Sequence, residues 1–182
     1  MAEARRIPNA ANNKLTQRDY AKLNVLVVED AKEMASLIRS FLRELGVKNV
    51  WSAATGEDAF SILNQYTVDI AIIDDLLPPL DGLSVVRAVR SAGDEKLAPI
   101  PVIYVTHLRT QESIINARDA GVTEILSKPY SFQQLVTRME TAILKPRQLV
   151  RSQDFVGPDR RRRRTGDASE RRRASDKPDS KE

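Results

Sequence analysis

Two pairs of acidic residues directly follow stretches rich in aliphatic residues. Glu29 and Asp30 come after the run at residues 25–28, and Asp74 and Asp75 come after a run that ends at residue 73. If both runs are parallel strands, their carboxyl ends meet at one edge of the sheet, where open α/β sheets bind their ligands. The carboxylates are therefore expected to lie close together.

A hydroxyl and an ammonium group are expected at the same edge. Thr106 ends another aliphatic run, and Lys128, followed by Pro129, comes after the last one. Carboxylates are ligands that suit Mg²⁺, which also keeps several waters. Its charge would offset the repulsion among the acids and the charge on a transferring phosphoryl group, and a lysine can bind a phosphoryl oxygen. These residues predict a site for Mg²⁺ and a phosphoryl group.

A second pattern with chemical potential lies near the C-terminus. Residues 162–167 and 171–176 both read Arg-Arg-Arg-x-x-Asp. An arginine fork can hydrogen-bond O6 and N7 of guanine, while a carboxylate accepts from N1–H and the exocyclic amine on the opposite edge. One Arg-x-x-Asp unit can therefore hold a guanine from two sides, and the duplication fits a ligand with two guanines and two phosphates.

The ligand predicted from this duplication is cyclic di-GMP. Its binding residues would be Arg160, Arg161, Arg162, Arg163, Arg164, Asp167, Arg171, Arg172, Arg173 and Asp176. Two other interpretations stay open: a solvated tail that aids solubility, and a basic segment that binds nucleic acid or anionic lipid through counterion release. A solubility tail does not require the repeated aspartate. A segment that binds phosphates should lack it, because an acid weakens that binding.

Hydrophobic periodicity indicates which elements position the acidic edge. Strands are expected at residues 25–28, 47–51, 68–73, 102–105 and 123–126, and helices at 34–45, 56–65, 83–90, 110–120 and 132–143. Thr55 can cap the helix at 56–65. Continuous aliphatic strands that alternate with helices are typical of a parallel sheet covered on both faces. The prediction is an α/β domain over residues 23–146, with a doubly wound five-stranded parallel sheet.

The two flanks differ from this centre. Residues 1–22 are polar and aperiodic, which predicts a flexible N-terminal arm. Residues 147–182 lose the hydrophobic period, and from residue 151 onward only Phe155 and Val156 are large and apolar. They cannot form a core, so we expect an arginine-rich tail that is disordered without ligand.

Composition narrows the class of protein. The chain has 182 residues and a net charge of +4; residues 151–182 hold 11 basic and 7 acidic residues, so the whole excess lies in the tail. There is no cysteine, which excludes disulfides and thiolate metal sites. No signal peptide or membrane-spanning stretch is apparent, and a cytoplasmic protein without membrane insertion is expected.

Four motifs in order, "VLVVED", "DDLLPPLDG", "YVTH" and "LSKPY", resemble the receiver domain of two-component response regulators of CheY-like size. The resemblance covers about residues 22–146 and implies a phosphorelay module with a possible histidine kinase as partner. It implies that Asp74 is the phosphoacceptor, because Pro78 and then Asp81 and Gly82 follow it as in the family. Asp75 is the neighbouring alternative.

The resemblance also implies a role for the other residues of the acidic edge. Glu29 and Asp30 would be the acidic pair, and the direct Mg²⁺ ligands would be Asp30, Asp74 and the carbonyl of Leu76. The remaining roles are a switch hydroxyl, Thr106, and a phosphoryl-binding lysine, Lys128.

Two positions depart from the family pattern. Ile125 stands where receivers usually carry Phe or Tyr, whose ring moves when the phosphoryl group arrives; alternatively it simply packs against the last helix. His107, the single histidine, stands where the residue is usually small. Its imidazole could obstruct phosphodonors or attacking water, or His107 is a partly exposed loop residue without function.

The C-terminal motif has resemblances of its own. Arg-x-x-Asp is similar to the inhibitory-site motif of diguanylate cyclases, and arginine runs followed by Asp-x-Ser resemble PilZ domains. A receiver followed by "FVGPDRRRRR" resembles the Cle group of CheY-like cyclic di-GMP effectors of alphaproteobacteria. That resemblance implies docking on the flagellar motor switch and control of motility and surface attachment.

We therefore predict a signalling adaptor that is not an enzyme, binds cyclic di-GMP through its tail and docks on the flagellar motor switch. The alternative is a conventional response regulator driven by phosphorylation of Asp74, with an incidental basic tail. A nucleic-acid regulator is the least favoured class, because no recognition helix is visible.

Overall fold

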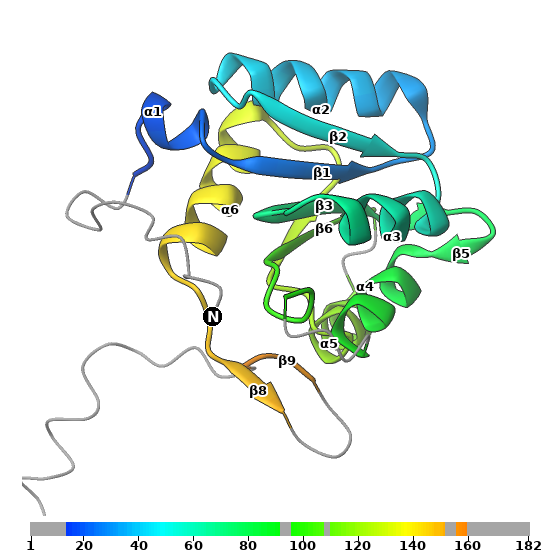
Figure 1. The fold of residues 1–182 in the computed structure, drawn as a ribbon. Coiled ribbons are helices and arrows are strands. Elements are labelled where there is room, and N and C mark those ends of the chain that lie inside the picture. The colour runs from blue at the N-terminus through cyan, green and yellow to red at the C-terminus, as the bar shows by residue number, and fades with distance from the viewer. Residues whose placement is uncertain (1–13, 92–95, 108–109, 152–155, 160–182) are drawn as a thin grey trace, which may run out of the picture.

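A five-stranded parallel sheet forms the centre of the molecule (Figure 1). The computed structural model describes residues 14–91, 96–107, 110–151 and 156–159. The sheet has the order β2-β1-β3-β6-β7 and consists of β1 (Asn24–Val28), β2 (Asn49–Ala53), β3 (Ile70–Asp74), β6 (Val102–Thr106) and β7 (Glu124–Ser127). The predicted α/β architecture is confirmed.

Helices cover both faces of this sheet (Figure 1). The helices α2 (Lys32–Glu44) and α6 (Phe132–Leu144) pack on one face, and α3 (Gly56–Gln65), α4 (Gly82–Ser91) and α5 (Gln111–Asp119) pack on the other. Three of them begin at a hydroxyl that accepts a hydrogen bond from the first turn, and these caps are Thr55, Thr110 and Ser131. The expected cap at Thr55 is confirmed.

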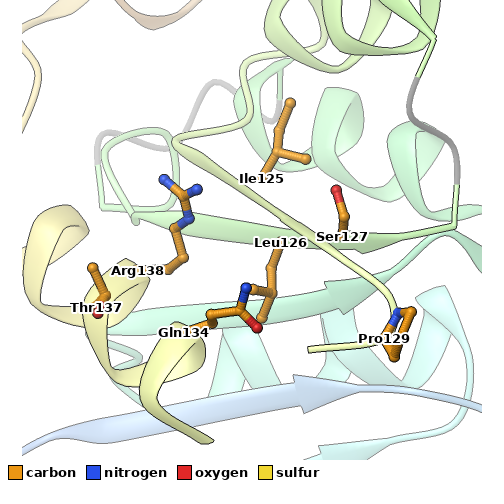
Figure 2. Close-up of a pocket in the computed structure, with 7 residues that line it drawn as sticks. All are labelled: Ile125, Leu126, Ser127, Pro129, Gln134, Thr137 and Arg138. Carbon is orange, nitrogen blue, oxygen red and sulfur yellow. The ribbon is translucent and has the colours of Figure 1, made fainter. Parts of the chain in front are cut away.

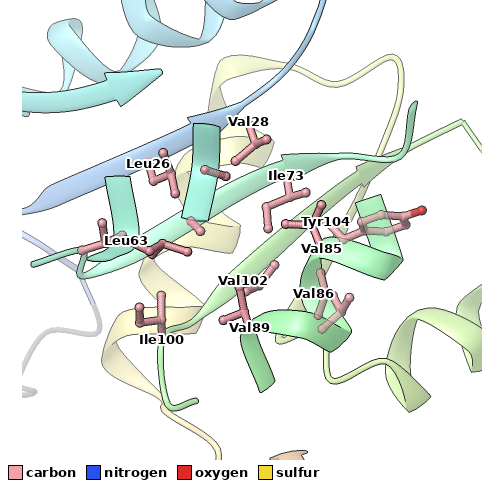
Figure 3. Close-up of a cluster of buried hydrophobic side chains, with 14 of the residues drawn as sticks. Leu26, Val28, Leu63, Ile73, Val85, Val86, Val89, Ile100, Val102 and Tyr104 are labelled. Carbon is pink, nitrogen blue, oxygen red and sulfur yellow. The ribbon is translucent and has the colours of Figure 1, made fainter. Parts of the chain in front are cut away.

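Alternation along the strands divides the core into two clusters. Leu26 and Val28 of β1 face the cluster shared with α3, α4 and α5, which Figure 3 shows. Val25 and Val27 face the cluster shared with α2 and α6. All four side chains are buried, because the sheet is covered on both sides.

The strand boundaries differ slightly from those expected. The second strand begins at Asn49 rather than at residue 47, because Gly46 ends α2 with φ 94° and the Val47 amide donates to the Leu42 carbonyl. Val47 is therefore part of the helix C-terminal turn.

A buried arginine fastens α4 to the rest of the domain. The Arg90 guanidinium donates to the carbonyl oxygens of Ala98 and Ile100, both at 2.8 Å, and to that of Gly121 at 3.0 Å. The side chain is 4% exposed and holds the segments before β6 and β7 against the helix.

The prediction of a flexible arm over residues 1–22 is wrong for its last part. A short helix, α1 (Gln17–Tyr20), follows a capping box at Thr16, and both Leu15 and Tyr20 are buried in the cluster beneath α6. The Leu15 amide also donates to Glu140 Oε1 at 3.0 Å. The apolar residues here are too few for a periodic signal, and α6 supplies the surface that they cover. Residues 1–13 lie outside the described part of the chain.

The prediction of disorder from residue 147 onward also needs correction. The strands β8 (Leu149–Arg151) and β9 (Val156–Pro158) form an antiparallel hairpin, and the Asp159 amide donates to the Gln148 carbonyl at 2.7 Å. β9 lies beside α4. The hairpin is therefore placed next to the domain, which the hydrophobic pattern of the sequence did not indicate. Among the described residues, no helix is long and apolar enough to cross a membrane.

Candidate functional site

The carboxyl ends of the central strands bring the predicted pocket residues together. The parallel register pairs Val28 with Ile73 and Asp74 with Val105, so the residues that follow these strands meet at one edge of the sheet. Glu29 and Asp74 are buried there, whereas Asp30 is exposed. One of the three acids is therefore accessible to solvent while the other two lie inside the domain.

Lys128 reaches the two buried acids. Its ammonium forms an ion pair with Asp74 Oδ1 and lies 3.6 Å from Glu29 Oε2. The backbone helps to place it, because the Lys128 amide donates to the Thr106 carbonyl at 2.8 Å. Burial alone would lower the pKa of Lys128, but the hydrogen bond and charge of Asp74, with the charges of Glu29 and Asp75, raise it above its usual value. Lys128 is therefore a permanent cation in the pocket.

Glu29 lies in a less favourable position. Burial and the charge of Asp74 raise the pKa of Glu29, although Lys128 and a hydrogen bond from the Ala31 amide act in the opposite direction. Ionised carboxylates that lie close together repel one another, and a cation bound between them offsets this repulsion.

The acidic residues can supply that cation site. Glu29, Asp30 and Asp74 each offer a carboxylate oxygen, and these oxygens lie within 4.8 Å of one another. Glu29 Oε2 is buried and accepts no hydrogen bond from the described residues, and the buried Asp74 Oδ1 faces the Lys128 ammonium. This all-oxygen donor set, partly buried and partly open, fits Mg²⁺.

The loop after Asp74 is held in a tight hairpin. The strands β4 (Leu76–Leu77) and β5 (Leu80–Asp81) pair antiparallel, and the Leu76 amide donates to Asp74 Oδ2 at 3.4 Å. At Gly82 an added Cβ would lie 1.9 Å from the Asp74 carbonyl oxygen, so only glycine allows this close return of the chain. The hairpin was not expected from the sequence, because its strands are too short for a hydrophobic period.

The predicted switch residue, Thr106, is at the same edge but points to a different acid. Its hydroxyl donates to Asp75 Oδ2 at 2.7 Å, and the backbone amide of His107 donates to the same oxygen at 3.2 Å. The side chain of His107 is exposed, which agrees with its interpretation as a loop residue. The contact between Asp75 and Thr106 was missed at the level of sequence, although a second acid at the end of a buried strand was a signal that it needs a donor.

Ile125 lines a groove on the surface between β7 and α6. Figure 2 shows Ile125 and Ser127 on the strand and Gln134, Thr137 and Arg138 on the helix; the groove has a volume of about 410 Å³. The Ile125 side chain packs against the cluster shared by α3, α4 and α5.

A second groove shares Ile125, Ser127 and Arg138 with the first. Its volume is about 400 Å³, and its basic lining residues are Arg118, Arg138 and Arg147. Both Arg138 and Arg147 pair with the buried Glu124, at 3.0 Å and 3.4 Å.

The cyclic di-GMP residues predicted from the sequence, from Arg160 to Asp176, lie outside the described residues. The structure leaves that part of the prediction untested. The described residues end at Asp159, which follows β9 and donates its amide to the Gln148 carbonyl.

Comparison with known proteins identifies the domain. A family model for the response regulator receiver domain matches residues 25–140. The chain belongs to the response regulator receiver family. The match spans the sheet, the acidic edge and most of α6, so the positions predicted from the four motifs now lie within an established receiver.

Two curated relatives are chemotaxis proteins. The receiver is 34% identical over 118 residues to the chemotaxis protein CheY of Pseudomonas aeruginosa, covering 65% of this chain and 94% of the relative. It is 29% identical to chemotaxis protein CheY-3 of Vibrio cholerae, covering 65% and 89%.

Two solved structures share the fold at similar identity. A putative response regulator from Chloroflexus aurantiacus has a TM-score of 0.61 and 30% identity, covering 68% of this chain and 98% of that one. The receiver domain of a sensor histidine kinase from Pseudomonas aeruginosa has a TM-score of 0.59 and 29% identity, with coverages of 68% and 98%. That domain was crystallised with a magnesium ion coordinated in its active site cleft.

Proposed function

We propose that Asp74 accepts a phosphoryl group while Glu29, Asp30 and Asp74 hold Mg²⁺. The observation that carries this proposal is the contact of Lys128 with both Asp74 and Glu29 at the end of the parallel strands. A lysine that is permanently charged beside a nucleophilic carboxylate can bind an incoming phosphoryl oxygen.

The residues suggest a simple transfer. An Asp74 oxygen attacks the phosphorus of a small phosphodonor or of a phosphohistidine in a histidine kinase. The new bond forms as the bond to the leaving group breaks, and the leaving group departs with its electron pair. Bound Mg²⁺ supplies positive charge against the phosphoryl oxygens. Lys128 moves its contact from the carboxylate to a phosphoryl oxygen, and the Gly82 turn holds the Asp74 backbone in place.

Acetyl phosphate with Mg²⁺ tests this proposal. We expect intact-mass spectrometry to find one added phosphoryl group on the full chain and none on Asp74→Asn. Asp75→Asn is the matched control because it changes the adjacent carboxylate, and it should still be labelled. Labelling of Asp74→Asn to the same extent as the original chain contradicts the proposed acceptor.

A second input is favoured by the duplicated Arg-Arg-Arg-x-x-Asp motif. We propose that the tail binds cyclic di-GMP and that the protein is an adaptor rather than an enzyme. The described structure gives the tail a defined starting point, because β9 lies beside α4 and Arg147 pairs with Glu124 of β7. A ligand that orders the tail would therefore do so next to the receiver surface.

The output proposed for this adaptor is docking on the flagellar motor switch. Two of the curated relatives are named chemotaxis proteins. The grooves beside Ile125 combine basic side chains with the exposed Ile114, a mixture that suits an acidic, partly apolar segment of a partner.

Titration calorimetry of the full chain tests the second input. Bidentate arginine–guanine pairs contribute roughly 1–3 kcal/mol each, so Arg164→Ala should weaken cyclic di-GMP binding by about tenfold. Asp167→Ala should weaken it too, whereas Lys181→Ala, outside the repeats, should not. Equal affinities for cyclic di-GMP, GTP and an oligonucleotide would leave only a polybasic tail.

A pull-down with the motor-switch component separates this adaptor from the conventional regulator. If Asp74→Asn abolishes partner binding while removal of residues 160–182 has no effect, the phosphorylation-driven alternative is the correct one. Dependence on the tail and on cyclic di-GMP supports the adaptor.

A further inference from the structure

The residue after the proposed phosphoacceptor is a second buried carboxylate with an unusual set of contacts. Asp75 is 7% exposed, and its Oδ2 accepts from the Thr106 hydroxyl at 2.7 Å and from the His107 amide at 3.2 Å. Its Oδ1 is buried and accepts no hydrogen bond from the described residues. Thr106 and His107 are therefore the hydrogen-bond donors that the structure shows for this carboxylate.

The backbone keeps Asp75 in this position. Its amide donates to the Val105 carbonyl at 2.9 Å, and its carbonyl accepts from the Gly82 amide at 3.0 Å. These bonds tie it to β6 on one side and to the start of α4 on the other. The carboxylate cannot leave Thr106 without breaking them or changing its rotamer inside a packed region.

Asp74 and Asp75 each bind one of the two groups that a phosphoryl group on Asp74 would contact. Lys128 is paired with Asp74, whereas the Thr106 hydroxyl is hydrogen-bonded to Asp75. A phosphoryl group on Asp74 can gain the hydroxyl only if Thr106 turns away from Asp75. That turn removes a donor from a carboxylate whose other oxygen accepts no hydrogen bond from the part of the chain that the structure describes, and an unsatisfied buried charge is strongly unfavourable.

We propose that Asp75 is a positioning residue that holds Thr106 and the start of the following loop in the unphosphorylated arrangement, and so opposes engagement of Thr106 by a phosphoryl group on Asp74. This inference rests on the proposed role of Asp74. Asp75 then competes with the phosphoryl group for the Thr106 hydroxyl. The strength of the hydrogen bond to Asp75 sets how strongly the phosphoryl group must bind Thr106 before the loop rearranges.

Beryllofluoride with Mg²⁺, a stable phosphoryl mimic, tests the inference on the full chain. A hydrogen bond to a charged group is strong enough that its removal in Asp75→Ala should tighten beryllofluoride binding by about tenfold to a hundredfold. Asp75→Asn keeps a carbonyl acceptor for Thr106 and should give a smaller gain. Affinity is read by calorimetry, and the amide NMR signals of Thr106 and His107 report the loop.

A double-mutant cycle separates the hydrogen bond from simple charge repulsion. Removing the Asp75 charge could favour an anion by itself, but that effect would persist in a Thr106→Ala background. The proposed effect requires the hydroxyl, so the gain from Asp75→Ala should disappear when Thr106 is replaced. A gain that is unchanged in that background, or equal affinities for the original chain and both Asp75 variants, overturns the proposal.

The same experiment distinguishes failure of this inference from failure of the proposed function. Binding that requires Asp74 but is indifferent to Asp75 overturns the positioning role alone. Binding that is absent from the original chain and from both Asp75 variants, or that survives Asp74→Asn, overturns the proposed acceptor and this inference with it. Thermal unfolding of each variant verifies that it is folded, and Asp75→Asn provides a nearly isosteric variant if Asp75→Ala is unstable.

Discussion

The strand-end pocket and the C-terminal tail both carry charge, but the arrangement of that charge differs. In the pocket, Glu29, Asp74 and Lys128 come from distant parts of the chain and meet in a buried place. In the tail, arginine and aspartate repeat at a fixed offset along one segment. A buried charge acts strongly on a few neighbours, whereas charges in water are screened and need repetition to act together. The function proposed for the pocket therefore depends on the fold, and the function proposed for the tail depends on local sequence.

The largest expected effect tests whether the two regions are independent. If the regions are independent, Asp74→Asn should abolish phosphorylation and change cyclic di-GMP affinity by less than about twofold, because independent sites contribute additively. Arg164→Ala should do the reverse. Acetyl phosphate labelling and calorimetry on both variants measure this, and a loss of cyclic di-GMP binding in Asp74→Asn would show that the regions are coupled.

The next effect compares one buried arginine with the arginines of the tail. Arg90→Met leaves three carbonyl oxygens without their donor, and should lower the free energy of unfolding by about 3 kcal/mol. Removal of residues 160–182 should change it by no more than about 0.5 kcal/mol. Urea unfolding provides both values.

The exposed Arg87 on the same helix provides the matched control, and Arg87→Met should have little effect. If Arg87→Met and Arg90→Met destabilise the protein equally, the three carbonyl contacts of Arg90 do not stabilise α4 as described.

A smaller effect concerns the hairpin that joins the regions. Arg147→Ala removes a cation that pairs with the buried Glu124, which should destabilise the protein by about 1 kcal/mol because Arg138 still compensates. Hydrogen exchange at the amides of β8 should become faster. The control is Arg118→Ala, whose ion pair with Asp119 is exposed and should contribute little. Unchanged exchange in Arg147→Ala would mean that the hairpin is held by other contacts.

The smallest effect is the pH dependence of stabilisation by Mg²⁺. Burial and Asp74 raise the pKa of Glu29 in the folded, metal-free protein, so protonation stabilises this state at low pH and that contribution is lost as pH rises through the folded-state pKa. Mg²⁺ needs the ionised carboxylates, so its increase of the thermal midpoint should be greater at about pH 8 than at about pH 5. Thermal unfolding with Mg²⁺ or with a chelator measures the difference, which Glu29→Gln should reduce. An increment that grows toward acid pH would contradict the assignment of this cluster.

The sequence by itself was sufficient for the architecture and for the position of the pocket. Strands buried on both faces read as continuous aliphatic runs, and helix caps such as Thr55 depend on a hydrogen bond to the adjacent turn. The acids at the ends of β1 and β3 could be placed together because parallel strands point in one direction. These features depend on local periodicity, which a single chain displays directly.

The partners of individual side chains, in contrast, follow from the tertiary structure. It assigned Lys128 to Asp74 and Thr106 to Asp75, placed Leu15 and Tyr20 beneath α6, and set Arg90 among three carbonyl groups. Asp74 and Asp75 carry the same side chain, and their contacts differ because successive residues of a strand end face different neighbours. Such choices depend on contacts between residues far apart in the chain, which no local pattern records.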